Sequence, residues 1–199
     1  DTDLDLSGVD SGRGLDITGD GGSNTIVGGA GADELTGGAG ADTLTGNTDG
    51  DVLNGGAGAD EFEVDQSLAG SAVIEIGDYS SAEGDTISFK NVDGLGNNLP
   101  EVAANLEVRG ATFDQDGKFI PDSETATNDL VVQFQENVDS SLNQGSGITN
   151  WNLLLKDAKG EAVSFDISGN NITGAQAFST FTVNTAEGAE LTGSADAEI

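Results

Sequence analysis

The sequence contains no cysteine, no histidine and no methionine. Without cysteine the chain can form neither a disulfide nor a thiolate metal site. Without histidine it cannot assemble a serine–histidine triad, a histidine–zinc site or a histidine general base. Carboxylates are abundant, which leaves a carboxylate-pair hydrolase chemically conceivable, but no pair of them is marked out by its spacing. We therefore expect that this chain is not an enzyme.

Positive charge is also scarce. Six Lys and Arg residues stand against 36 Asp and Glu residues, so the formal net charge is −30. Six scattered cations cannot neutralise a phosphate backbone, which argues against nucleic acid as a partner, and an anionic membrane surface is disfavoured for the same reason. No apolar run is long enough to form a transmembrane segment. A chain this acidic either stays disordered or brings its carboxylates to a cation.

What the sequence does contain is a repeat of nine residues between about residues 10 and 63. Its best units read GGAGADELT, GGAGADTLT and GGAGADEFE, and they begin at Gly28, Gly37 and Gly55. Position eight of each unit is apolar, and position six of the last four units is aspartate. The apolar residues are Ile17, Ile26, Leu35, Leu44, Leu53 and Phe62, and the aspartates are Asp33, Asp42, Asp51 and Asp60.

This spacing predicts a coil. Positions seven to nine alternate polar and apolar residues, which is the period of a short strand with one buried face, and the glycines before them predict a turn. Two units complete one circuit, so residues 18 apart in the sequence stack at about one strand spacing, roughly 4.8 Å. Asp33 then lies over Asp51, and Asp42 over Asp60, and each pair repels unless a cation lies close by. Calcium, which takes about six to eight oxygen ligands, suits such turns better than magnesium.

The three best units resemble the RTX (haemolysin-type calcium-binding) nonapeptide repeats, whose units form a parallel β-roll. In that family each calcium ion lies between one unit and the second unit after it, bound by two position-six side chains and by backbone carbonyls. The resemblance implies several calcium ions. The first site would comprise Gly29, Gly31, Asp33, Gly46, Thr48 and Asp51. The second would comprise Gly38, Gly40, Asp42, Gly55, Ala57 and Asp60. A third, weaker site would comprise Asp20, Gly22, Asn24, Gly37, Ala39 and Asp42, with Asn24 in the place of an aspartate.

The segment after the last unit, residues 73–89, reads as two strands separated by a turn. It resembles the segment that follows and caps many RTX rolls, and Asp78 and Asp85 match its acidic positions. The resemblance implies that these two aspartates close the last calcium site. The alternative is that they only form a turn.

Further along, β-forming runs at residues 106–113, 129–134, 151–158, 162–167 and 178–183 predict an antiparallel β region, for which a sandwich is one arrangement. We therefore expect an all-β fold in three parts: a parallel β-roll over residues 1–70, capping strands and an antiparallel β domain over 71–185, and the start of a further degenerate repeat or a linker over 186–199. The two ends read as those of a segment from a longer protein.

Two other features leave alternatives open. The spacing of Asp114, Asp116 and Asp122 partly resembles that of a calcium-binding loop, although a solvent-exposed hairpin turn at Asp116-Gly117 explains them better. Trp151 alternates with Leu153 and Leu155 and fits a buried strand face better than a sugar-binding platform.

The whole pattern predicts a calcium-dependent structural module of a secreted bacterial surface protein. Repulsion within the −30 chain keeps it unfolded at low calcium, and calcium outside the cell supplies the free energy of folding. The resemblance implies type I secretion and a role in a surface layer, an extracellular fibre or a biofilm matrix, through self-association or contact with other cell-surface or matrix components. Two alternatives stay open. One is an adhesin that binds a glycan or host surface through residues 106–185, and the other is the non-catalytic tail of a secreted RTX enzyme or toxin.

Overall fold

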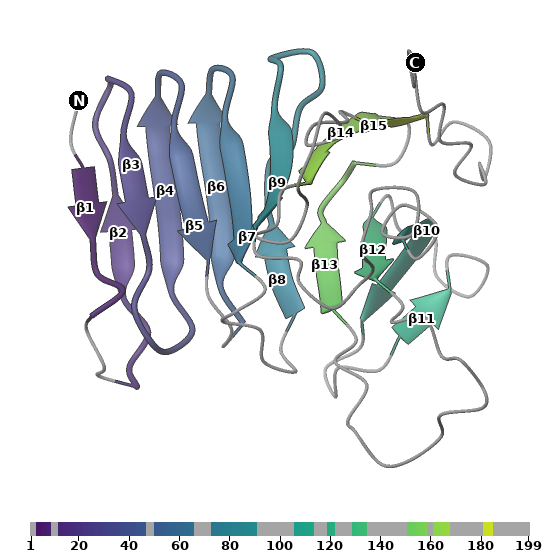
Figure 1. Cartoon of the computed structure of the whole chain (residues 1–199), viewed down its shortest axis with the longest axis horizontal. Helices are drawn as coiled ribbons and strands as arrows, with labels where there is room; N and C mark the ends of the chain where they lie inside the picture. Colours follow the sequence, from purple (N-terminus) through teal and green to yellow (C-terminus); the bar gives the residue numbers. More distant parts are fainter. Residues whose placement is uncertain are drawn as a thin grey trace, which may run out of the picture.

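Two β-sheets face each other along the molecule (Figure 1). The computed structural model describes residues 3–8, 12–46, 50–65, 73–90, 106–113, 119–121, 129–134, 151–158, 161–167 and 181–184. Within these ranges every regular element is a β-strand, which confirms the all-β prediction. None of the described segments forms a helix with the length and hydropathy that crossing a membrane requires.

The first sheet has seven strands. In spatial order they are β1 (Asp3–Asp5), β3 (Thr25–Val27), β5 (Thr43–Gly46), β7 (Glu61–Asp65), β9 (Thr86–Lys90), β14 (Ala162–Ile167) and β15 (Phe181–Asn184). The second sheet has eight. Their order is β11 (Phe119–Pro121), β10 (Leu106–Phe113), β12 (Leu130–Phe134), β13 (Trp151–Leu155), β8 (Val73–Ile76), β6 (Val52–Ala57), β4 (Glu34–Ala39) and β2 (Asp16–Thr18).

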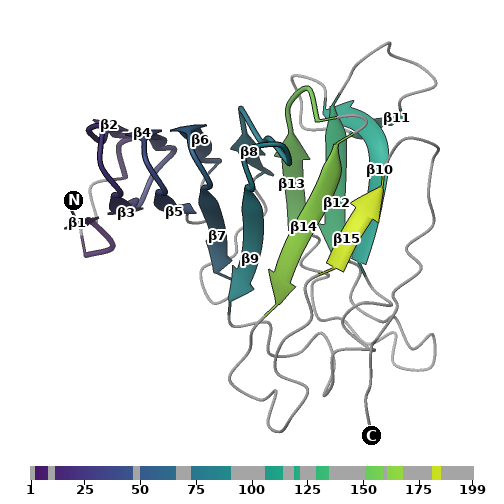
Figure 2. The same ribbon diagram turned by 90° about the horizontal axis from the view of Figure 1, so that it is seen from above.

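The nonapeptide units form a parallel coil, because successive strands alternate between the two sheets. Figure 2 shows β2, β4 and β6 in one row and β3, β5 and β7 in the other. From β2 to β5, each strand pairs in parallel with the second strand after it, and the partners are 18 residues apart, as in Leu35 with Leu53 and Leu44 with Phe62. The predicted stacking of two units per circuit is confirmed.

Position eight of the units supplies the core between the sheets. The strand register aligns its side chains with apolar residues of the flanking strands in two columns, one in each sheet. Burying one such side chain fully contributes about 1.5–3 kcal/mol. Because the side chain is buried only when neighbouring circuits stack on it, each circuit is stabilised mainly by its neighbours. One column is Leu4, Ile26, Leu44, Phe62 and Ile87. The other is Ile17, Leu35, Leu53, Ile76 and Leu155.

The coil continues past the last nonapeptide unit with longer circuits. Leu53 pairs with Ile76 and Phe62 with Ile87, offsets of 23 and 25 residues. The two strands predicted within residues 73–89 are therefore present, and they lie in different sheets. Both columns extend through them without interruption.

The five β-forming runs beyond residue 106 all contain strands, and these join the same two sheets. The prediction of antiparallel pairing holds for β10, β11 and β12, for β12 with β13 and for β14 with β15. In addition, β13 lies parallel to β8 and β14 parallel to β9, which the sequence did not indicate. Asp114, Asp116, Asp122, the side chain of Trp151 and residues 186–199 lie outside what the structure describes.

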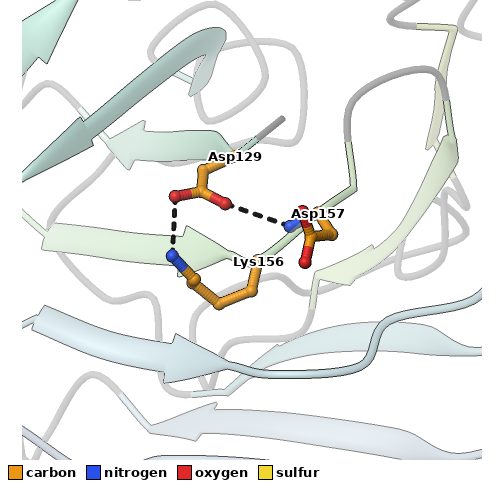
Figure 3. A network of polar contacts seen from close by, with 3 residues as sticks. All are labelled: Asp129, Lys156 and Asp157. Carbon is orange, nitrogen blue, oxygen red and sulfur yellow. Dashed lines mark hydrogen bonds and ion pairs between the residues drawn. The ribbon is translucent and has the colours of Figure 1, made fainter. Parts of the chain in front are cut away.

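An internal ion pair joins the start of β12 to the end of β13 (Figure 3). Asp129 is buried, and its Oδ2 lies 2.7 Å from Lys156 Nζ, while its Oδ1 accepts a hydrogen bond from Asp157 N at 3.1 Å. Lys156 N in turn donates to Ile76 O at 2.9 Å. The hydrogen bond to Asp129 raises the pKa of Lys156 above its usual value of 10.5. This carboxylate is thus neutralised by the chain itself.

Candidate metal centre

Position six of the units forms a column of buried aspartates that runs beside the apolar core. Each of these side chains is at most 4% exposed, so bulk water cannot hydrate the carboxylates. The last member follows the nonapeptides: Thr86 pairs with Glu61, so the residue before Thr86 continues the column. Its members are Asp33, Asp42, Asp51, Asp60 and Asp85.

Each aspartate bridges two circuits. Its Oδ1 accepts a hydrogen bond from a backbone amide at the position-six residue one circuit earlier, and these bonds are 2.7–3.0 Å long. The donor–acceptor pairs are Leu15 N with Asp33, Asn24 N with Asp42, Asp33 N with Asp51, Asp42 N with Asp60, and Asp60 N with Asp85. The backbone therefore fixes the height of every carboxylate in the column.

The second carboxylate oxygen lies against the glycine at position one of the same unit. A Cβ on Gly37 would lie 2.6 Å from Gly55 O and closer still to Asp42 Oδ2. A Cβ on Gly55 would collide with Asp60 Oδ2 in the same way. Glycine is required there because any side chain would displace the carboxylate. Asp42 Oδ2 and Gly55 O, two predicted ligands of the second site, thus both lie against Gly37.

Two of these oxygens have no hydrogen-bond partner. Asp42 Oδ2 and Asp60 Oδ2 are buried and unpaired. Burial, helped by the neighbouring charges of Asp85, Asp42 and Asp78, raises the pKa of Asp60 to about 6, although the hydrogen bond from Asp42 N lowers it. Burial is also the main cause that raises the pKa of Asp85. An unpaired buried carboxylate oxygen is costly, and a bound cation removes that cost.

The donor set fits calcium. The carboxylates of the column and the carbonyls of the glycine turns are all hard oxygen ligands, which calcium prefers. Among the residues that the structure describes, no three acidic side chains gather at one point. The site that the resemblance implied, with two aspartates and backbone carbonyls, does not require such a cluster.

The first predicted site is described in part. Asp33 Oδ2 accepts a hydrogen bond from Gly29 N at 2.8 Å, and Asp51 lies one circuit on with its Oδ1 at Asp33 N. Gly31 has a left-handed φ of 110°, and a Cβ there would approach the Arg13 backbone of the preceding circuit. Thr48 lies outside the described residues.

In the second site, Gly38 and Gly40 have left-handed φ angles of 117° and 126°. Gly40 N donates to Ala57 O at 2.8 Å, which ties the two turns together. In the third predicted site Ala39 N donates to Asp20 O at 3.2 Å, and the buried Asn24 side chain is hydrogen bonded within its own unit.

Asp78 and Asp85 have different roles at the end of the roll. Asp78 accepts from Gly55 N and Gly56 N, both at 2.8 Å, and so caps the amides of the last unit. Asp85 accepts from Asp60 N at 3.0 Å and from Ser80 N at 2.8 Å, and Tyr79 OH donates to its carbonyl. The structure thus places Asp85 in the column and Asp78 at its end, a distinction that the sequence did not reveal.

A coil of parallel strands with glycine turns and a buried aspartate column is the architecture of a calcium-binding β-roll. The family comparison agrees: residues 18–53 and 36–65 match the model of the RTX calcium-binding nonapeptide repeat (4 copies). Residues 18–65 therefore consist of RTX repeats, and repeats of this family bind calcium. RTX repeat proteins are usually secreted or extracellular.

No curated protein matches the chain. Its structure is similar to the solution structure of the AlgE6R3 subunit from the Azotobacter vinelandii mannuronan C5-epimerase, with 21% identity, a TM-score of 0.42, and coverage of 94% of this chain and 96% of that chain.

Proposed function

We propose that this chain is a non-catalytic, calcium-dependent structural module of a secreted protein, and that it folds when it meets extracellular calcium. The observation that carries the proposal is the pair of buried, unpartnered oxygens Asp42 Oδ2 and Asp60 Oδ2 within a column of aspartates. Without a cation this column opposes folding of a chain that already carries a net charge of −30.

The ions would lie between aspartates of successive circuits. Asp33 with Asp51, Asp42 with Asp60, and Asp60 with Asp85 are the pairs that the hydrogen-bond ladder brings together. Bound calcium would neutralise these charges and link adjacent turns through carbonyls such as Gly55 O. Extracellular calcium sites have dissociation constants of about 10⁻⁴–10⁻³ M, so folding would be coupled to calcium near the millimolar range.

Circular dichroism of the whole chain tests this coupling. We expect a weaker β signal in excess EGTA, where the roll is unfolded, than in 10 mM calcium, with a reversible transition between them. Magnesium at the same concentration and ionic strength should be far less effective, because its small octahedral shell fits these turns poorly. A β signal of equal size in EGTA and in calcium would refute calcium-dependent folding.

A matched pair of variants tests the assignment to the column. Asp42→Asn removes a charge from the predicted second site, whereas Asp157→Asn makes the same change at an exposed position outside the roll. Asp157 has a φ of 52°, which asparagine adopts readily. Equilibrium dialysis should show that Asp42→Asn binds about one calcium ion fewer and that Asp157→Asn binds as many as the wild type. Equal binding by all three proteins would contradict the assignment.

We propose further that the module contributes to an extracellular assembly, such as a surface layer or matrix, by joining a second copy. Leu4, which is 37% exposed at the end of an apolar column in β1, supports this role. Sedimentation velocity should show polymers in calcium but not in EGTA, and Leu4→Asp should remove them. A monomer under both conditions would instead favour an adhesin or the tail of a secreted enzyme or toxin.

A further inference from the structure

The third predicted calcium site contains an asparagine where the later units have an aspartate. Asn24 is buried, with 2% of its surface exposed. Its Nδ2 donates to Gly22 O at 2.7 Å and to Asp20 Oδ1 at 3.1 Å, while its Oδ1 accepts from Asp20 N at 2.9 Å. Asp20 Oδ1 also accepts from Gly22 N at 2.8 Å. Residues 20–24 thus form a closed hydrogen-bond network around the Asn24 amide.

The orientation of this amide follows from its partners. Asp20 N can only donate, so the atom facing it must be the oxygen. Gly22 O and an ionised Asp20 Oδ1 can only accept, so the atom facing them must be the nitrogen. Reversing the amide would set donor against donor and acceptor against acceptor. The Nδ2 group therefore points toward the oxygens of this turn.

The equivalent turn one circuit later differs in one respect. A Cβ on Gly19 would collide with both Asn24 Oδ1 and Gly37 O. In the same way, a Cβ on Gly37 would collide with both Asp42 Oδ2 and Gly55 O. Asn24 Oδ1 has a hydrogen-bond donor, whereas Asp42 Oδ2 has none. Asp33 Oδ2 also accepts from the amide at position two of its unit, so the feature specific to Asn24 is its Nδ2 group. The Asn24 Nδ2 group meanwhile bonds to Gly22 O, a carbonyl that a calcium ion would need.

We propose that the turn formed by residues 20–24 closes without calcium, and that the Asn24 Nδ2 group takes the place of the ion. A neutral amide supplies the positive end of a dipole to Gly22 O and Asp20 Oδ1, and it adds no charge to the column. Calcium binding is then confined to the circuits from Asp33 onward, and this turn forms a calcium-free end of the roll. The inference rests on the proposed function for the other sites.

Calcium stoichiometry tests this substitution directly. Equilibrium dialysis at pH 7.5 would compare the whole wild-type chain with Asn24→Asp and Asn24→Ala, each folded at saturating calcium. Asn24→Asp replaces the Nδ2 donor with an oxygen ligand and should bind one more ion than the wild type. Asn24→Ala should bind the same number as the wild type, because the asparagine holds no ion there. One ion fewer in Asn24→Ala, or no gain in Asn24→Asp, would overturn the proposal.

A second measurement keeps the test valid if Asn24→Ala does not fold. In wild-type protein with ¹⁵N-labelled asparagine, the Asn24 side-chain NH₂ protons should remain protected from exchange at saturating calcium. Rapid exchange of these protons at saturating calcium would overturn the proposal, because it would mean that an ion displaces the amide from Gly22 O. If the wild type binds no calcium while Asn24→Asp binds one ion, the proposed function fails and the present inference is supported.

Discussion

The roll and the sheets that extend beyond it solve the same electrostatic problem in two ways. Both bury aspartates: the roll buries a column of them, and the extension buries Asp129. In the extension, Lys156 reaches the carboxylate at 2.7 Å, so the countercharge belongs to the chain. In the roll, backbone amides hold one oxygen of each carboxylate, and the second oxygens of Asp42 and Asp60 have no partner.

The difference concerns when each part is stable. A countercharge built into the chain is present under all conditions, so the Asp129–Lys156 contact forms whenever its strands do. A countercharge taken from solution makes stability depend on the concentration of that ion. The roll takes its countercharge from solution, whereas β12 and β13 carry theirs in the chain. The two parts of the molecule should therefore respond differently to calcium.

Removing calcium should have the largest effect and should separate the two parts. At 10 mM calcium, two sites with dissociation constants of about 10⁻⁴–10⁻³ M stabilise the fold by roughly 3–5 kcal/mol. Hydrogen exchange should therefore show about 10²- to 10⁴-fold less protection of β4 to β7 in EGTA. The amides of β12 and β13 should lose less. Equal losses throughout would mean that the two parts do not differ energetically.

A methyl group at a position-one glycine should disrupt the roll alone. Gly37→Ala would push the new Cβ into Asp42 Oδ2 and Gly55 O, which we expect to cost about 1–3 kcal/mol and to weaken calcium binding. Gly21→Ala is the matched control, because nothing lies within 4 Å of its Cβ; its effect should stay within about 0.5 kcal/mol. Chemical denaturation in 10 mM calcium measures both. Equal losses would show that the contact with the carboxylate is unimportant.

Charge removal should distinguish a solvent-derived countercharge from an internal one. The stability lost in Asp42→Asn should grow by up to about 1.4 kcal/mol for each tenfold rise in calcium above the dissociation constant. The loss in Lys156→Met should be about 1–3 kcal/mol at every calcium concentration, because the ion pair with Asp129 involves no calcium. Denaturation at 2 and 20 mM calcium, at matched ionic strength, provides the comparison. If the stability lost in Lys156→Met also depended on calcium, the proposed difference between the roll and the Asp129–Lys156 ion pair would be wrong.

The smallest effect should come from pH. The pKa of Asp60 in the folded chain is raised to about 6 from a usual value of 3.8. The folded state therefore binds its proton more tightly than the unfolded state, and the stability of the calcium-free fold should rise as pH falls from 7.5 toward 5. Asp60→Asn should reduce this pH dependence. Lys156 does not contribute in this range, because its pKa is raised above 10.5 and its stabilisation is lost only at higher pH.

Thermal unfolding in EGTA with a mild stabilising osmolyte measures the pH effect. A midpoint that falls on acidification from pH 7.5 to 5 would show that the charge on Asp60 does not oppose folding of the calcium-free chain.

The structure of the repeats could be predicted from the sequence, because each nine-residue unit contains the residues that determine its strand and its turn. The ninefold spacing of the apolar residues and aspartates fixes both the stacking and the column, and both are found in the structure. The parallel pairing of β13 with β8 could not be predicted, since the partners are about 80 residues apart and share no period with the repeats. β1 was missed because three residues, two of them aspartates, carry too little β-forming pattern.

The candidate site was predictable in its residue types but not in its individual roles. Asn24 looked like a weakened ligand, and only its hydrogen bonds to Asp20 and Gly22 identify it as a donor. Asp78 and Asp85 looked equivalent in the sequence. The longer circuits after the last unit place one at the amides of Gly55 and Gly56 and the other in the column, and no local spacing contains that information.

The hydrogen-bond ladder also has a direction. In each of its steps the carboxylate belongs to the later circuit and the amide to the earlier one, from Leu15 N with Asp33 to Asp60 N with Asp85. Deleting the first circuit removes only a donor from the column. Deleting the last one leaves amides of the remaining circuit without their acceptors, including those that Asp78 caps. The two ends of the roll are therefore not interchangeable, and shortening it from the C-terminal side should be the more damaging of the two truncations.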